Sequence, residues 1–221
     1  MGEGHKIKLA QGDTSWILAP FLVGFIFVVL GIIFTSVLRS VSLFVAVIFF
    51  LLTGFFLLFF RDPERKIGNG IVIPADGRIR EISDVTDPDV GKCTLISTFM
   101  NVYNVHVNRM PFDGIIKDVV HHPGSHLPAF KKESERNEKV ISTIKTDIGT
   151  IKIIQIAGTL ARRIVPYIKK GDTLKKGEKI GIIRLGSRVD IYLPSKAIKT
   201  ICVKEGDRVK AGEDTLAEIN A

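Results

Sequence analysis

Acidic and basic residues are absent from two long stretches of this sequence. Residues 16–38 contain no Asp, Glu, Lys or Arg, and neither do residues 41–60. Each stretch approaches the roughly 20 apolar residues that a helix needs to cross a bilayer. A cleavable signal peptide fits poorly, because there are two stretches and both are too long. A chain of 221 residues also could not bury both of them in one soluble core.

The two uncharged stretches predict a transmembrane helical hairpin within residues 1–60. Only Arg39 and Ser40 separate them, and one continuous helix would be about twice as long as the hydrocarbon core is thick. We therefore expect spans at about 16–38 and 41–60, with Arg39 extending to the far interface. Basic flanks stay mainly in the cytoplasm, so both ends of the hairpin are expected on that side of the cell membrane. These flanking residues are His5, Lys6, Lys8, Arg61, Arg65 and Lys66.

Cysteine is scarce, and no pattern of metal ligands is present. The separation of Cys93 and Cys202 matches no metal or redox motif, and both lie in apolar, strand-like surroundings. We interpret them as reduced core residues of a cytoplasmic domain. Three histidines at positions 121, 122 and 126 lack Cys or carboxylate partners at ligand spacing, so no metal site is expected.

Residues 61–221 have the composition of a basic, water-soluble domain. They contain 28 basic and 21 acidic residues, which gives a formal charge of +7. A tethered domain with this charge would be attracted to anionic lipid headgroups, although a solvated basic surface explains the charge equally simply. Nucleic acid is not an expected partner, because no recognisable binding motif accompanies the charge.

Short β-rich runs separated by Gly, Pro and Asp predict a mainly β fold, a sandwich or a barrel. Only residues 127–137 and 101–105 suggest helical turns. The expected strands are 71–74, 94–99, 115–120, 140–146, 150–156, 179–183 and 188–193.

An internal repeat supports this architecture. Residues 168–178, IKKGDTLKKGE, align with residues 203–213, VKEGDRVKAGE, at an offset of 35 positions. The pattern resembles the hammerhead turns of lipoyl and biotinyl carrier domains. A membrane-tethered carrier or adaptor module without catalysis is therefore a rival hypothesis. The chain lacks the Met-Lys-Met or Asp-Lys-Ala tip at which such carriers are modified.

Two polar side chains outside the repeat are candidates for chemistry. Asp76 follows a short strand in the turn Pro-Ala-Asp-Gly, where an Asp is usually structural. His106 lies among Asn104, Asn108 and Arg109, and it could act as a general acid or base or be satisfied by these neighbours.

The dipeptide Gly186-Ser187 also has a chemical use. An unhindered glycine carbonyl allows the following Ser hydroxyl to attack the peptide bond between them. A turn is the simpler interpretation, and a second pair, Gly124-Ser125, shows that the dipeptide alone is weak support.

The order of these motifs resembles that of short-form phosphatidylserine decarboxylases, including archaeal relatives that act on archaetidylserine. The matching segments are FFRDP at 59–63, PADG at 74–77, NVHVNR at 104–109, NE at 137–138, AG at 157–158, ARRIV at 161–165 and LGSRVD at 185–190. The resemblance covers nearly the whole chain beyond about residue 16.

The resemblance implies that residues 61–221 form a pyruvoyl-dependent decarboxylase made as a zymogen. Ser187 would attack the Gly186 carbonyl, and the chain would split between them into a β chain and an α chain. Ser187 would become the pyruvoyl cofactor, which forms a Schiff base with the amine of a serine phospholipid. His106 would act as base, with Asp76 orienting or stabilising it.

The resemblance leaves several roles open. Asn108, Arg162, Arg163 and His121 are guesses for contacts to phosphate or carboxylate. Longer family members carry a second histidine where this chain has Arg109, so the roles of the histidines in self-cleavage and in decarboxylation are not separable. Ester or ether lipid chains and the oligomeric state also stay open.

Overall fold

The computed structural model describes residues 7–10, 14–125, 137–158, 163–184 and 187–220. The chain divides into two compact units, residues 1–64 and 65–221, and each is described by itself. The first unit contains the two apolar segments, and the second contains the predicted β domain.

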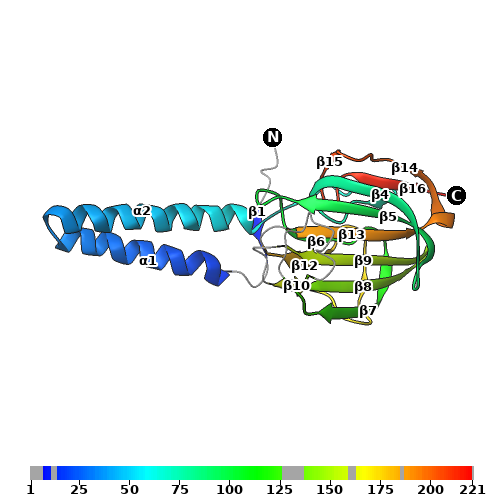
Figure 1. Ribbon diagram of the computed structural model, residues 1–221, viewed down its shortest axis with the longest axis horizontal. Coiled ribbons are helices and arrows are strands. Elements are labelled where there is room, and N and C mark those ends of the chain that lie inside the picture. Colours follow the sequence, from blue (N-terminus) through cyan, green and yellow to red (C-terminus); the bar gives the residue numbers. More distant parts are fainter. Residues whose placement is uncertain (1–6, 11–13, 126–136, 159–162, 185–186, 221) are drawn as a thin grey trace. The chain divides into compact units, whose positions relative to one another are not determined.

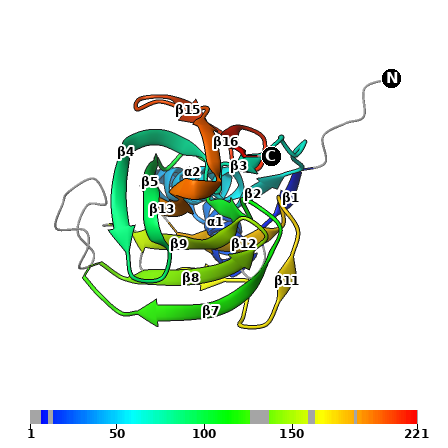
Figure 2. The ribbon, with the colours of Figure 1, turned by 90° about the vertical axis from the view of Figure 1, so that its right-hand side faces the viewer.

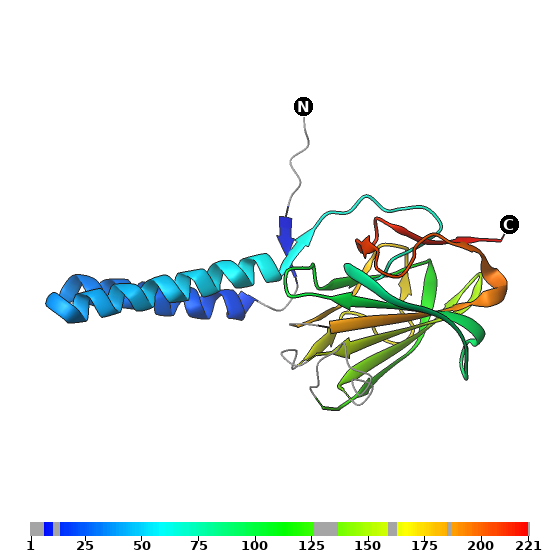
Figure 3. The same cartoon turned by 45° about the horizontal axis from the view of Figure 1, so that its top comes forward.

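Two antiparallel helices dominate the first unit (Figures 1 and 3). Helix α1 (Thr14–Ile33) has 20 residues and α2 (Ser36–Phe59) has 24, so they are about 30 and 36 Å long. Both are long and apolar enough to cross a membrane, and most of their large apolar side chains are exposed. The predicted apolar hairpin is confirmed.

The break between the helices is not where we expected it. Phe34 and Thr35 separate them, and Arg39 belongs to the first turn of α2 instead of the connection. Charge alone predicted the break at Arg39. A long arginine near a helix end can extend its guanidinium to water from within the helix, so its position does not mark the turn.

The segment that follows α2 forms a small sheet within the same unit. Strand β2 (Arg61–Pro63) pairs antiparallel with β1 (Ile7–Leu9). The FFRDP segment therefore spans the helix end at Phe59 and the whole of β2.

The second unit is mainly β, as predicted. Its elements are β3 (Ile71–Val72), β4 (Gly77–Asp87), β5 (Gly91–Met100), β6 (Val107–Arg109), β7 (Gly114–His122), β8 (Lys139–Thr146), β9 (Gly149–Ala157), β10 (Ile164–Pro166), β11 (Thr173–Leu174), β12 (Lys179–Ile183), β13 (Ser187–Pro194), the 3-10 helix Ser195–Ala197, β14 (Ile198–Ile201), β15 (Arg208–Val209) and β16 (Thr215–Ile219). All seven predicted strands are present. Residues 101–105 form a turn and no helix, while residues 127–136 lie outside the described part of the chain.

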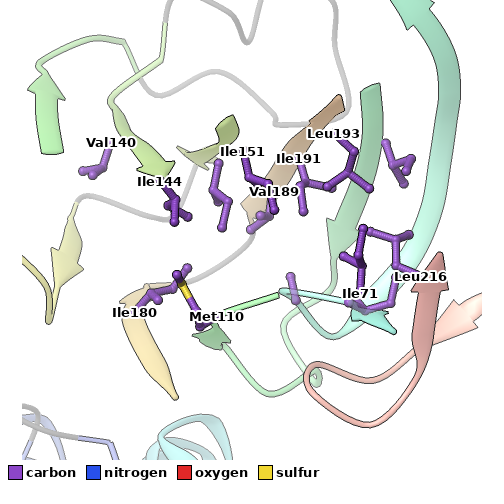
Figure 4. Close-up of a cluster of buried hydrophobic side chains, with 14 of the residues drawn as sticks. Ile71, Met110, Val140, Ile144, Ile151, Ile180, Val189, Ile191, Leu193 and Leu216 are labelled. Atoms are coloured by element: carbon purple, nitrogen blue, oxygen red, sulfur yellow. The ribbon is translucent and has the colours of Figure 1, made fainter. Parts of the chain in front are cut away.

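Three open sheets surround one core. The largest has the order β11-β7-β8-β9-β13-β5-β4-β15, and two three-stranded sheets have the orders β10-β12-β6 and β14-β16-β3. Figure 4 shows side chains of the large sheet, such as Ile144 and Val189, facing Ile180 and Leu216 from the small sheets and Met110, which directly follows β6. Within the described residues no sheet closes on itself, so the arrangement is not a closed barrel.

The internal repeat covers both edges of the large sheet (Figure 2). In the first copy, Ile116 exchanges backbone hydrogen bonds with Gly171 and Asp172, at 2.9 and 2.8 Å. In the second copy, Ile79 exchanges the same bonds with Gly206 and Asp207, at 2.9 and 3.0 Å. Each copy thus adds a two-residue strand, β11 or β15, that protects an edge from pairing with another chain.

The segments that the repeats cover are also related to each other. Residues 74–79, PADGRI, and residues 111–116, PFDGII, make equivalent turns. Asp76 accepts a hydrogen bond from the Ala211 amide, and Asp113 accepts one from the Lys176 amide, both at 2.7 Å. The second unit is therefore built from two similar halves.

One prediction about cysteine is wrong. Cys93 is buried as expected, but Cys202 is exposed. Cys202 directly follows the edge strand β14, where successive side chains alternate between the core and solvent, and it falls on the solvent side. Apolar neighbours in the sequence do not show on which side of the strand the Cys202 side chain lies.

Candidate active site

Ser187 begins β13, a central strand of the large sheet. It pairs with Met100 on β5 and with Ala157 on β9. Its side chain faces the core, like those of Val189 and Ile191, because alternate residues of a strand point to the same face. It is fully buried. Its hydroxyl donates a hydrogen bond of 3.3 Å to the Met100 sulfur, a weak acceptor that leaves the oxygen lone pairs available.

A buried polar chain continues from Met100 into the core. The side-chain amide of Asn108 donates to the Met100 sulfur at 3.8 Å, and Gln155 donates to the Asn108 carbonyl oxygen at 2.7 Å. Asn108 and Gln155 are both almost completely buried. The sequence analysis missed Gln155, although an amide side chain between Ile154 and Ile156 in a buried strand is a signal for a polar contact in the core.

His106 lies beside the segment that leads into Ser187. It is fully buried, and its Nδ1 is 2.9 Å from the Asn104 carbonyl oxygen. Its own carbonyl oxygen accepts a hydrogen bond of 3.3 Å from the Ile183 amide, where β12 pairs with β6. Residue 183 precedes Ser187 by four positions, so this pairing brings His106 close to the predicted cleavage site.

Asp76 is held between a buried arginine and two main-chain amides. Both carboxylate oxygens accept hydrogen bonds from Arg65, at 3.1 and 2.9 Å, and Oδ1 also accepts one from the Ala211 amide. Burial raises the pKa of Asp76, while Arg65 and the amides of Ala211 and Val105 oppose the increase. Because Val105 directly precedes His106, Asp76 supports the backbone on which His106 is carried.

Arg65 was predicted to flank the membrane, but the structure buries its side chain. It is 6% exposed and pairs with Asp76 and with Glu213, at 2.9 and 3.2 Å. Arg65 therefore belongs to the interior of the β domain. Arg65 follows an apolar span in the sequence, and that position alone does not show whether an arginine is buried or exposed to solvent.

Several polar residues meet beside Ala157, the neighbour of Ser187 on β9. The Asn137 side chain donates to the Ala157 carbonyl oxygen at 2.7 Å, and the Glu138 carbonyl oxygen accepts from the Ala157 amide. The Glu138 carboxylate is 2.9 Å from His121 Nε2 and accepts a hydrogen bond of 3.2 Å from the Ile164 amide. The NE and AG motifs are thus brought together next to Ser187.

Of the four guessed substrate contacts, the three that the structure describes do not meet in one place. Asn108 lies in the core, whereas His121 and Arg163 are exposed. Glu138 links them, because it contacts His121 and the amide that follows Arg163. Arg162 lies outside the described residues, as does Gly186 of the predicted cleavage site.

A pocket opens next to Asp76. Its volume is about 530 Å³, and its walls come from the PADG turn, the 101–104 turn and the second repeat. Asn104, whose carbonyl oxygen contacts His106, is one of the lining residues. The pocket therefore gives solvent a path toward the groups that surround His106 and Asp76.

Comparison with known proteins agrees with these motifs. Residues 52–217 match the family model described as phosphatidylserine decarboxylase. A Methanococcoides burtonii protein, provisionally named archaetidylserine decarboxylase proenzyme, is 42% identical over 95% of this chain and 96% of its own length. A phosphatidylserine decarboxylase proenzyme of Thermobifida fusca is 42% identical, over 95% and 92%. A proenzyme of the same name from Nitratidesulfovibrio vulgaris is 48% identical, over 78% and 81%.

Proposed function

Because this chain belongs to the phosphatidylserine decarboxylase family, we propose that it converts a serine phospholipid into the ethanolamine phospholipid and CO₂. The observation that carries the proposal is the position of Ser187. It is fully buried at the start of a central strand, next to the segment that pairs with His106. The internal repeat resembles the turns of carrier domains, and a fold alone does not indicate catalysis.

We infer that the chain first cleaves itself between Gly186 and Ser187. The Ser187 hydroxyl attacks the Gly186 carbonyl, the peptide C–N bond breaks, and an ester forms in its place. A base then removes the Ser187 α-proton, and the ester leaves as the Gly186 carboxylate, which completes the break. Water converts the resulting dehydroalanine to a pyruvoyl group, with release of ammonia.

His106 is the base in this proposal, and Asp76 is a positioning residue. His106 can accept a proton near neutral pH and lies beside the strand that precedes the cleavage site. Asp76 acts through the Val105 backbone and through the Ala211 amide, which fixes the second repeat against the PADG turn. Asn108 and Gln155 hold Met100, the residue that contacts the Ser187 hydroxyl.

The surroundings of Ser187 fit a pyruvoyl group. Such a group would bind the substrate amine covalently and accept the electron pair released as CO₂ leaves. The apolar neighbours Met100 and Ala157 exclude water on both sides of residue 187, while the amides of Asn108 and Gln155 lie one contact further away. This chain supplies the buried position.

Mass spectrometry of the purified full chain tests self-cleavage. A break before Ser187 would give an α chain of 35 residues (221 − 187 + 1) that begins with pyruvoyl, while Ser187→Ala would stay whole. A natively folded wild-type chain that remains uncut would contradict the proposal. It would favour the carrier or adaptor module, and a modified lysine would then distinguish the carrier.

We also propose that the helical hairpin crosses the cell membrane and that the β domain faces the cytoplasm. This places the catalytic domain where only the lipid headgroup needs to leave the bilayer.

Cys202 is exposed and Cys93 is buried, so a membrane-impermeant maleimide should label Cys202 in inside-out vesicles only. Cys202→Ser is the control. Labelling of wild-type right-side-out vesicles would reverse the orientation.

A further inference from the structure

The pocket beside Asp76 carries an unusual pair of arginines. Arg78 on β4 and Arg208 on β15 lie directly opposite each other, and both line the pocket. Like charges at directly opposed positions of an antiparallel pair are destabilising. Among the residues that the structure describes, neither arginine has an acidic partner within ion-pair distance. The Arg78 Nε–H donates to the Gly206 carbonyl oxygen, which leaves its terminal nitrogens free to contact a ligand.

The two halves of the domain show that the fold does not require these arginines. The equivalent pair in the other half is Ile115 on β7 and Thr173 on β11, which are also directly opposed. Both pairs hold a short edge strand with the same backbone hydrogen bonds. An uncharged pair therefore serves the structural purpose, and the charge occurs only in the half that contains Asp76.

The pair also lies at a suitable distance from Ser187. Arg78 is opposite Phe99 across β4 and β5, and Phe99 is opposite Arg188 across β5 and β13. Arg78 and Arg188 are thus two strands apart, about 10 Å between their Cα atoms. Ser187 begins β13 opposite Met100, the last residue of β5, and the pocket is lined by the 101–104 turn that follows Met100. A ligand in the pocket therefore lies at the same end of the sheet as residue 187.

A phosphate diester matches this arrangement. Arginine presents a planar fork of donors that binds phosphate oxygens in pairs, and two opposed guanidinium groups can share one phosphate. Lys210 adds a third cation to the lining, although it also pairs with Glu213 at 3.3 Å. In a serine phospholipid, only a short chain separates the phosphate from the amine that reacts.

We propose that Arg78 and Arg208 form the phosphate-binding site for the substrate headgroup. This inference rests on the proposed function for the identity of its ligand. The positive pair is stabilised when the phosphate lies between the two guanidinium groups, and this contact aligns the serine amine with residue 187. Asn101 and Asn104 also line the pocket.

A binding experiment on the uncut full chain in detergent micelles tests the site without requiring turnover. In the Ser187→Ala background, the dissociation constant for glycerophosphoserine is measured by calorimetry for the parent, Arg78→Gln and Arg208→Gln. Each arginine substitution should weaken binding about tenfold or more. Lys204→Gln is the matched control, because it removes one charge from the same repeat outside the pocket and should bind as the parent does.

Two further probes identify the ligand chemistry. Glycerophosphocholine that binds with the same arginine dependence would show that the phosphate diester is recognised, and inorganic phosphate that binds equally well would assign the site to free phosphate instead. Unchanged binding in both arginine variants, or a parent that binds no probe, would overturn the inference. If the Ser187→Ala parent shows arginine-dependent binding but the wild-type chain never cleaves itself, the phosphate site is kept and only the decarboxylase function is rejected.

Discussion

Asp76 and Asp113 occupy equivalent turns but have different environments. Each accepts one amide hydrogen bond from the neighbouring repeat. Asp113 is exposed, whereas Asp76 is buried and is paired with Arg65. The amide hydrogen bond that both residues accept is therefore structural. The burial of Asp76 and its pairing with Arg65 are specific to the candidate site.

Parallel substitution of these two residues separates structure from catalysis. Asp113→Asn weakens one amide contact and should lower the free energy of unfolding by about 1 kcal/mol. Asp76→Asn also leaves the buried Arg65 without one of its charged partners and should lower it by about 3–5 kcal/mol. Only Asp76→Asn should slow self-cleavage, by about a hundredfold, because only Asp76 supports His106. Urea unfolding and the time course of intact mass measure the two effects. Equal cleavage rates in both variants would reduce Asp76 to a turn residue.

The Gln155–Asn108 hydrogen bond can be tested by a double-mutant cycle. Gln155→Leu leaves the Asn108 carbonyl oxygen buried without its donor, so we expect a loss of about 1–3 kcal/mol in unfolding free energy. Adding Asn108→Leu removes the stranded acceptor and should recover much of that loss. Urea denaturation of both single variants and the double variant provides the numbers. Strictly additive losses would show that the two side chains act independently.

The sequence names candidate residues for the site but does not show how they are arranged. Ser187, His106 and Asp76 came from motif order, and the structure places them at three strand ends. The contacts of Arg65 and Gln155 were missed, because both depend on chain segments at least 11 positions away from their partners. Such pairings follow from strand register, which short motifs do not encode.

At the scale of elements, the hairpin β4–β5 is attached to β9 by one lysine. Lys152 on β9 lies 2.6 Å from Asp87 at the end of β4 and 2.5 Å from Asp89 in the following turn. Its side chain is buried and also lies near the Tyr192 ring. Burial alone would raise the pKa of Asp87, but its hydrogen bonds, first of all from Lys152, lower it.

The Lys152 contact should make stability depend on acid pH. The unfolded Asp87 carboxyl binds a proton more readily than the folded one, so this contribution is present above about pH 4 and is lost as the pH falls through the folded pKa. Lys152→Met should lower the unfolding free energy by about 2 kcal/mol at neutral pH and flatten its decline in acid. Lys199→Met, which breaks an exposed pair with Glu218, is the control. Parallel acid profiles for Lys152→Met and wild type would contradict this role.

The elements themselves were largely predictable where the pattern is local. All seven expected strands exist because apolar alternation and Gly or Pro boundaries lie within each segment. The long strand β4 was missed, since residues 80–87 mix charged and apolar side chains on a partly exposed edge of the sheet. The position of the helix break was wrong because it was inferred from Arg39 alone.

At the scale of the whole β domain, the two repeats stabilise the edges of the sheet that carries the candidate site. The two copies protect the two edges of one large sheet, which leaves the central strands free to carry the site. Ser187 lies on one of these central strands, and both strands that contact it belong to the part of the chain before the cleavage point. The proposed cleavage before Ser187 would therefore cut the chain at a position where the sheet itself continues to hold both pieces.

This topology predicts that the α and β chains stay together after cleavage. Residues 187–220 carry β13, which pairs on both sides with strands of the β chain, and they bury Val189, Ile191, Leu193 and Leu216 in the shared core. Burial of each such side chain stabilises the complex by about 1.5–3 kcal/mol. This stabilisation exceeds the favourable free energy from the conformational freedom that the chain gains when one peptide bond is broken. Native gel filtration should show one species of the same size for wild type and Ser187→Ala, and only denaturant should release the α chain from wild type. Loss of the α chain from the native wild-type protein would mean that β5 and β9 do not hold β13 after cleavage. The site at Ser187 would then be lost when the chain is cut.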